Sequence, residues 1–273
     1  MNSFFNVNFM LRNKVKTKFL SKISKILSNF NSISLEELDD VKLLKRFDQK
    51  FTITTSQFEV IFPFLAKNYH CLTINNNQIF EYTTDYYDSE DFAMFNDHHN
   101  GKLNRYKIRF RDYINTKNSF LEIKYKTNKG QTIKNRQEVN FKEREFNAEN
   151  LNFIEENSPY KLYSLGKKLS NKFHRITLAN VINKERITID NAIHFSNEND
   201  DKTLQKLVVI EIKKLKNNMD SAVNQLLKSN GVRPTSFSKY AIGSALMNPK
   251  LKYNRFKNKL SYLNTIHNGT IWH

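Results

Sequence analysis

The sequence predicts an α+β protein in which eight antiparallel strands close into a tunnel and helices pack outside it. Apolar and charged residues alternate with a period of two in eight separate segments, which is typical of strands that bury one face. Clusters of Asn, Gly and Asp separate most of these segments, and strands joined by short turns favour an antiparallel sheet or barrel. The charged side of the strands carries mostly Lys and Arg, which indicates that the sheet closes around an anion.

The expected elements follow in chain order. The eight strands lie at residues 43–54, 78–88, 103–113, 118–127, 131–142, 171–180, 185–195 and 205–214. Helical spacing predicts helices at 57–67, 149–156, 219–229 and 238–247, and Ser34 with Glu37 fits a capping box that opens a short helix at 35–40. The expected layout is a basic N-terminal extension at 1–40, one tunnel domain at 41–247 and a basic C-terminal tail at 248–273.

Residues 11–30 are expected to form a basic amphipathic helix. Val15, Phe19, Ile23 and Phe30 share one helical face, and lysines occupy much of the remainder. Such a helix either packs on its own domain or associates weakly with an anionic membrane surface. Because no second anchoring signal is visible, we expect it to pack on the outer wall of the tunnel.

The charge balance calls for a polyanionic partner. The chain has 44 Lys and Arg against 27 Asp and Glu, a formal net charge of +17, which costs self-repulsion unless an anion offsets it. Nucleic acid, an anionic membrane and a phosphate-rich substrate all fit this balance. The single cysteine, Cys71, excludes an intrachain disulfide, no apolar run reaches transmembrane length, and the order of charges at the N-terminus is the reverse of a signal peptide. The expected location is the cytoplasm.

The segment 105–111 shows the charged strand face most clearly. Its four cations, Arg105, Lys107, Arg109 and Arg111, point to one side of the strand and its apolar residues to the other. Half-buried strands with one solvated face would show the same alternation. However, same-face neighbours lie about 7 Å apart, where like charges repel unless an anion lies between them. Cations also outnumber acids over six such segments, so we expect the cations to line a phosphate-binding tunnel.

Eight segments, taken in order, carry a family resemblance. They are Leu44–Phe51, Tyr87–Ser89 with His99–Lys102, Arg109–Tyr113, Leu121–Lys124, Lys134–Arg136, Glu185–Asp190, Val209–Lys213 and Ser238–Tyr240. Together they resemble the VTC (vacuolar transporter chaperone) polyphosphate polymerase domain of the bacterial stand-alone kind, within the CYTH or triphosphate tunnel metalloenzyme superfamily. The resemblance runs from about Leu43 to Met247.

This resemblance implies a metal-dependent phosphotransferase that adds the γ-phosphate of ATP to a growing polyphosphate chain inside an eight-stranded tunnel. Its cofactor would be Mn or Mg. The implied catalytic cations are Lys50, Arg109, Arg111, Lys124, Lys134, Arg186 and Lys239. The charged strand faces add further candidates for substrate binding: Arg46, Lys107, Lys126, Arg136 and Lys213. The implied metal ligand is Glu211, and Asp48 and Glu122 are further acidic candidates.

The sequence departs from the family pattern at three positions. Arg46 replaces the first Glu of the Glu-x-Glu-x-Lys signature, Phe51 stands where Tyr is usual, and Ser236 stands where the polymerases have a cation. A triphosphatase of the same superfamily, with water as the acceptor, stays open as an alternative. A non-enzymatic nucleic-acid binder fits less well, because its aromatic residues should interleave with exposed cations, whereas here they alternate onto the opposite face.

Overall fold

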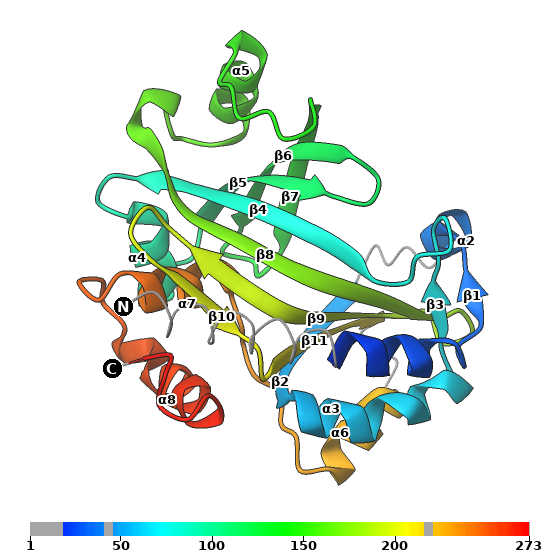
Figure 1. Cartoon of the computed structure of the whole chain (residues 1–273). Helices are drawn as coiled ribbons and strands as arrows, with labels where there is room; N and C mark the ends of the chain where they lie inside the picture. The colour runs from blue at the N-terminus through cyan, green and yellow to red at the C-terminus, as the bar shows by residue number, and fades with distance from the viewer. Residues whose placement is uncertain (1–18, 41–45, 216–220, 273) are drawn as a thin grey trace, which may run out of the picture. The chain divides into compact units, whose positions relative to one another are not determined.

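The computed structural model describes residues 19–40, 46–215 and 221–272 (Figure 1). It contains one eleven-stranded sheet whose main path runs β2-β11-β9-β8-β4-β5-β6-β7. Each of the eight predicted strands corresponds to one strand of this path. The chain divides into two compact units, made of residues 1–79, 175–192 and 205–237 (unit 1) and residues 80–174, 193–204 and 238–273 (unit 2).

The prediction of a closed eight-stranded barrel is wrong. The sheet has eleven strands, and its end strands, β2 and β7, do not pair with each other in the described part of the chain. The three additional strands, β1 (Ser32–Ile33), β3 (His70–Leu72) and β10 (Asp201–Leu204), are too short to show a period of two. Closure depends on a pairing between distant strands, which alternation within one strand does not encode. The exposed cations Lys134 and Arg136 on β7 are typical of an edge strand.

Unit 1 is built around the antiparallel pair β2 (Arg46–Thr54) and β11 (Leu207–Leu215), and β11 also pairs with β9 (Glu185–Ser196). β3 pairs with β1 and with the end of β8 (Leu165–Asn180). Its helices are α2 (Leu35–Asp40), α3 (Thr55–Ile61), the 3-10 helix η1 (Phe62–Lys67) and α6 (Ala222–Ser229). The predicted helix 57–67 is therefore α3 followed by η1. Thr54 and Gln57 form the capping box that begins α3, directly after β2.

The N-terminal helical residues 19–27 belong to the core of unit 1. Ile23 and Leu27 are buried together with Phe58 of α3 and apolar residues of β2, β9 and β11. Lys22 also forms an ion pair with Glu59 of α3, at 2.7 Å. Figure 1 shows this helix beside α3. The protein itself thus covers the described part of the predicted apolar stripe, whereas Val15 lies outside the described residues.

Unit 2 contains the meander β4 (Phe80–Ser89), β5 (Arg105–Tyr113), β6 (Asn118–Lys126) and β7 (Thr132–Val139), and β10 pairs with the end of β9. Its helices are α4 (Ala93–Asn100), α5 (Ala148–Asn157), α7 (Lys239–Met247) and α8 (Lys257–Ile266), with 3-10 turns η2 (Leu162–Ser164) and η3 (Asn254–Phe256). The predicted helices 149–156 and 238–247 are α5 and α7.

The sequence did not predict α4, because no side chain at its own start caps it. Instead Asp88, at the end of β4, accepts hydrogen bonds from the backbone N–H groups of Met94 and Phe95, each at 2.9 Å. Asp88 is fully buried and also accepts a hydrogen bond from the hydroxyl of Tyr240. One carboxylate therefore joins β4, α4 and α7.

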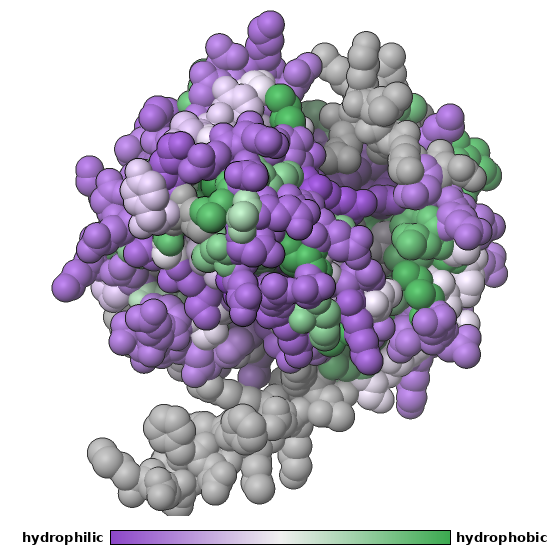
Figure 2. Space-filling view, turned by 90° about the horizontal axis from the view of Figure 1, so that it is seen from above, coloured by the Kyte–Doolittle hydropathy of each residue, from purple (hydrophilic) through white to green (hydrophobic). Residues whose placement is uncertain are grey.

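The surface matches the charged composition. In the face seen in Figure 2, hydrophilic residues cover most of the area and smaller hydrophobic patches lie between them. In the described part of the chain, no helix combines the length and the apolar character needed to span a bilayer.

Candidate functional site

Two of the four cations predicted on β5 are buried rather than solvated. Arg109 and Arg111 are only 7% and 8% exposed. On the other side of the strand, Ile108 and Phe110 are buried in an apolar cluster with residues of β4, β6 and α5. Both faces of β5 are therefore covered, and the alternative of an ordinary solvated face does not hold for these two arginines.

Glu122 of β6 supplies the negative charge beside Arg109. Its side chain is fully buried, and Oε2 accepts a hydrogen bond from Nε of Arg109 at 2.7 Å. Its other oxygen, Oε1, forms an ion pair with Lys134 of β7. Burial alone would raise the pKa of Glu122, but the positive charges of Arg109, Arg111 and Lys134 hold that pKa well below its usual value. Glu122 is thus an ionised carboxylate that orients two cations.

Lys124 of β6 lies between two other lysines. Its register partners are Lys107 on β5 and Lys134 on β7, and Lys126 is in the same way opposite Arg105. Like charges directly opposite each other destabilise a sheet. Repulsion by Arg109, together with burial, holds the pKa of Lys124 well below its usual range. A bound polyanion would relieve this repulsion.

Lys239 begins α7 and lies near Arg111 of β5, because both side chains approach the ring of Phe173. Its Nζ is 4.3 Å from the ring centroid of Phe173 on β8, and the guanidinium carbon of Arg111 is 5.9 Å from that same ring. Ser238 caps α7, and its hydroxyl accepts a hydrogen bond from Nζ of Lys107 at 3.0 Å. The Ser-Lys-Tyr motif therefore sits beside the cations of β5.

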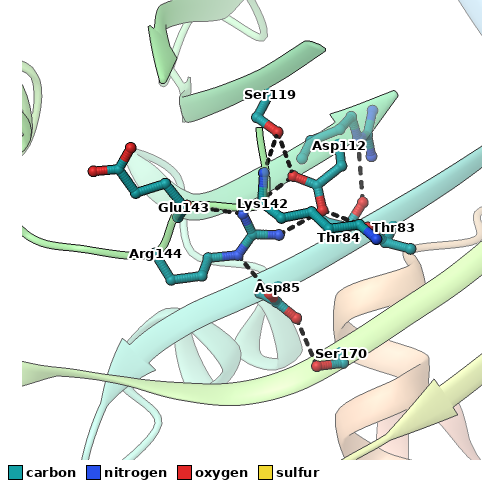
Figure 3. A network of polar contacts seen from close by, with 10 residues as sticks. Thr83, Thr84, Asp85, Asp112, Ser119, Lys142, Glu143, Arg144 and Ser170 are labelled. Atoms are coloured by element: carbon teal, nitrogen blue, oxygen red, sulfur yellow. Dashed lines mark hydrogen bonds and ion pairs between the residues drawn. The ribbon is translucent and has the colours of Figure 1, made fainter. Parts of the chain in front are cut away.

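A clamp on the opposite side of β5 supports the strand (Figure 3). Arg144 donates from Nε to Asp85 of β4 at 2.7 Å and from Nη2 to Asp112 of β5 at 2.7 Å. The two carboxylates also accept hydrogen bonds, each at 2.6 Å, from three hydroxyls: Thr83, Ser119 and Ser170. Because Asp112 directly follows Arg111, the clamp holds the backbone that carries the cations.

Unit 1 contains a second cluster around Glu211 of β11. Nζ of Lys50 lies 2.6 Å from Oε1 of Glu211, and Nζ of Lys213 lies 3.3 Å from Oε2. Burial would raise the pKa of Glu211, but the charges of Lys213, Lys50 and Arg175 hold it well below the usual value. Arg175 in turn forms a two-point ion pair with Asp190, at 2.6 and 2.8 Å.

The other candidates of unit 1 lie around this cluster. Arg186 is opposite Lys213 in register and donates to the backbone carbonyl of Leu38 at 3.1 Å. Asp48 is exposed and is opposite Lys213 on the other side of β11. Arg46 begins β2, and its side chain lies outside the described part of the chain.

Glu211 and the neighbouring Thr188 could hold a metal ion only if a bound ligand supplied further oxygen atoms. Among the described residues, no group of three or more His, Cys, Asp or Glu side chains is placed to hold a metal ion. Thr188 lies directly opposite Glu211 on β9, and its buried hydroxyl has no hydrogen-bond partner among the described residues. One carboxylate beside a spare hydroxyl fits Mg or Mn when phosphate oxygens and waters complete the coordination shell.

The structure thus groups the predicted site residues within each unit. Unit 2 holds nine of them: Lys107, Arg109, Arg111, Glu122, Lys124, Lys126, Lys134, Arg136 and Lys239. Unit 1 holds the other six: Arg46, Asp48, Lys50, Arg186, Glu211 and Lys213. Arg136 is exposed, and its guanidinium carbon lies 4.8 Å from the ring centroid of Phe120.

Sequence reasoning missed Arg175, Arg144 and Thr188. Arg175 stands in a predicted strand next to the apolar Ile176, so the alternation could have indicated it. Arg144 lies in the segment between β7 and α5, where no periodicity exists. Thr188 becomes notable only once its register opposite Glu211 is known.

Comparisons with known proteins give one family and several distant structures. The profile of the VTC domain family matches residues 45–248. No curated protein matches the chain. A candidate adenylate cyclase from Bacillus halodurans matches at 12% identity over 71% of this chain and 94% of its own, with a TM-score of 0.45. A candidate adenylyl cyclase from Hippeastrum, described as having a dominant triphosphatase activity, matches at 10% identity over 75% and 97%, with a TM-score of 0.47.

The family profile carries the assignment by itself. It spans most of the described strands, from the start of β2 to the end of α7, and includes every site residue discussed above. It ends before η3 and α8. Since the match covers well over half of the sequence, this chain belongs to the VTC domain family.

Proposed function

We propose that the protein is a polyphosphate polymerase that transfers the γ-phosphate of ATP to the end of a polyphosphate chain. Membership of the VTC domain family supports an enzyme that acts on polyphosphate or triphosphate substrates in general. The observation that carries the finer proposal is the charge imbalance on β5, β6 and β7. There Arg109, Arg111 and Lys134 act on one buried carboxylate, Glu122, and the two arginines are buried as well.

Such an arrangement suits phosphoryl transfer, which needs positioning and charge stabilisation more than covalent help from the protein. Arg109 is fixed by Glu122, and Arg111 is fixed by Thr84, whose hydroxyl accepts from its Nε at 3.2 Å. Guanidinium groups held in this way present fixed donors to the equatorial oxygens of the transferred group. They need little reorganisation during the reaction, which is the source of their catalytic benefit.

The lysines have a different role in the proposal. Lys124 and Lys134 supply positive point charge to the phosphate chain, and Lys239 adds charge from the start of α7. The acceptor is the terminal phosphate of the chain, which is already ionised, so the reaction requires no serine or cysteine nucleophile. The bound anion relieves the repulsion between Lys124 and its neighbouring cations, and this relief favours binding.

Glu211 is the proposed protein ligand of Mn or Mg. When bound, the metal would neutralise charge on the substrate phosphates. Glu211 would then exchange one of its two lysine partners, Lys50 or Lys213, for the metal, and the released lysine would become available to phosphate oxygens. This role of Glu211 is tested by measuring Mn binding with electron paramagnetic resonance in the presence of tripolyphosphate. Glu211→Gln should weaken it, while Glu156→Gln, at an exposed position of α5, should leave it unchanged.

The direct test of the proposal is product analysis after incubation with ATP and Mn or Mg. A polymerase gives a ladder of phosphate chains on a gel and releases ADP in equal amount to the phosphate incorporated. Release of inorganic phosphate without chains would contradict the polymerase and identify a triphosphatase with water as the acceptor.

A further inference from the structure

The C-terminal segment beyond the family match packs against α4, the helix that precedes β5 in the chain. Phe256 of η3 is buried, and its ring centroid lies 6.1 Å from that of His98 and 5.2 Å from that of His99, both on α4. Arg255 donates from Nη1 to the backbone carbonyl of Asn100 at 2.6 Å. The start of α8 is therefore held on the C-terminal end of α4.

This contact brings Lys259 close to His98. Lys259 is half-buried in the first turn of α8, three residues after Phe256, the N-cap residue of that helix. Burial, together with the charges of Lys107, Arg105, Lys126 and Lys259, lowers the pKa of His98 to about 2. His98 is therefore neutral, and it feels the positive charge of four cations from β5, β6 and α8.

Two features of this cluster indicate an anionic ligand. Arg105 and Lys126 are directly opposite each other across β5 and β6, a like-charge pair that costs stability unless an anion offsets it. In addition, Nδ1 of His98 is buried and has no hydrogen-bond partner in the described part of the chain. Burial lowers the pKa of Arg105, and Asp97, whose negative charge opposes this effect, already forms an ion pair with Lys102 at 3.2 Å.

We infer that Arg105, Lys126, Lys259 and His98 form a second anion subsite, which holds inner phosphates of a linear polyphosphate chain beyond the catalytic cations. The inference rests on the proposed function and extends it to a longer substrate. Arg105 and Arg111 are six residues apart on one strand, so the row of cations is about 20 Å long. A chain of only three phosphates occupies part of this row, whereas a long chain spans it and reaches Lys259.

The experiment compares the affinities of tripolyphosphate and of long-chain polyphosphate for the full-length protein. Lys259→Gln should weaken binding of the long chain several-fold and leave tripolyphosphate binding unchanged. Lys257→Gln is the matched control, because Lys257 is exposed on the same helix. Lys259→Arg should restore the affinity for the long chain.

The outcomes separate this inference from the proposed function. The inference of a second subsite would be overturned if long-chain polyphosphate bound with equal affinity to the Lys259→Gln variant, the Lys257→Gln variant and the parent protein. An equal loss in both variants would also overturn it, since that result shows only a general charge effect. If Arg109→Ala leaves the affinity for tripolyphosphate unchanged, the proposed function itself fails, whatever Lys259 does.

Discussion

Glu122 lies directly opposite Arg109 across β5 and β6, and the two side chains form a buried ion pair. The same carboxylate also holds Lys134 from the third strand. Without Glu122, neighbouring cations on three strands would repel one another in a region that water only partly reaches. We regard Glu122 as the residue that allows this set of cations to exist in the absence of substrate.

The first prediction concerns the stability that Glu122 provides. Replacing Glu122 with Gln removes the counter-charge of Arg109 and Lys134 without a large change of volume. Breaking a buried ion pair from one side costs about 3–5 kcal/mol. We therefore expect the free energy of unfolding, measured by urea titration, to fall by about this amount.

A matched control is Glu156→Gln, at an exposed position of α5 in the same unit, which should change the stability little. The account of Glu122 would be contradicted if both variants unfolded at the same urea concentration. Tripolyphosphate should also bind more tightly to the folded Glu122→Gln variant than to the parent protein, because fewer cations remain neutralised.

The second prediction follows from the lowered pKa of Glu122 in the folded protein. Its unfolded pKa is about 4.3, so the ion pairs contribute fully above that value. Their contribution is lost as the pH falls toward the lower folded pKa. The free energy of unfolding should therefore decrease as the solution is acidified below about pH 4, and the decrease should be smaller in Glu122→Gln. Identical pH dependence in the two proteins would remove Glu122 as the cause.

The third prediction concerns Lys124, whose pKa is held well below the usual range by Arg109 and by burial. A bound phosphate chain stabilises the charged ammonium, so the pKa of Lys124 rises on binding and the protein takes up protons. Affinity should consequently fall as the pH rises through the lowered pKa of Lys124. Calorimetric titrations with tripolyphosphate in buffers of different ionisation enthalpy measure this uptake.

Lys124→Gln should reduce the proton uptake, and Lys129→Gln, at the exposed turn between β6 and β7, should not. An unchanged uptake in Lys124→Gln would assign the protons to another group.

The fourth prediction tests the clamp of Arg144. Lysine at this position keeps the charge but cannot bridge Asp85 and Asp112 with a planar fork. We expect Arg144→Lys to lower the free energy of unfolding by about 1–3 kcal/mol, because buried carboxylate oxygens lose hydrogen bonds. If the clamp also positions β5, kcat falls while the KM for ATP changes little. A loss of stability with unchanged kcat would limit Arg144 to a structural role.

The alternation of residues was sufficient to predict the long strands and the burial of the two arginines on β5. The four cations at 105–111 formed a clear pattern because side chains on a strand repeat every two residues. The short strands β1, β3 and β10 had no such pattern, and the open edge at β7 depends on long-range pairing.

Tertiary contacts account for the other misses. Asp88 caps α4 from outside the helix, so no cap appeared in the sequence around residue 93. Likewise the sequence predicted only a basic tail at 248–273, since the position of Lys259 depends on Phe256 packing against His98. Which carboxylate pairs with which cation, as for Glu122 and Lys134, depends on strand register rather than on local sequence.

The most direct test of the central claim is the gel ladder of products formed from ATP and Mn by Arg109→Ala and by Lys129→Ala. The claim is that buried cations on β5, rather than the general positive charge, hold the phosphate chain during transfer. Removal of one preorganised charge donor typically lowers kcat by about 10²–10³. We expect Lys129→Ala to form the ladder of products at the normal rate and a folded Arg109→Ala to form almost none. Equal rates of product formation by the two variants would contradict the role of the buried cations.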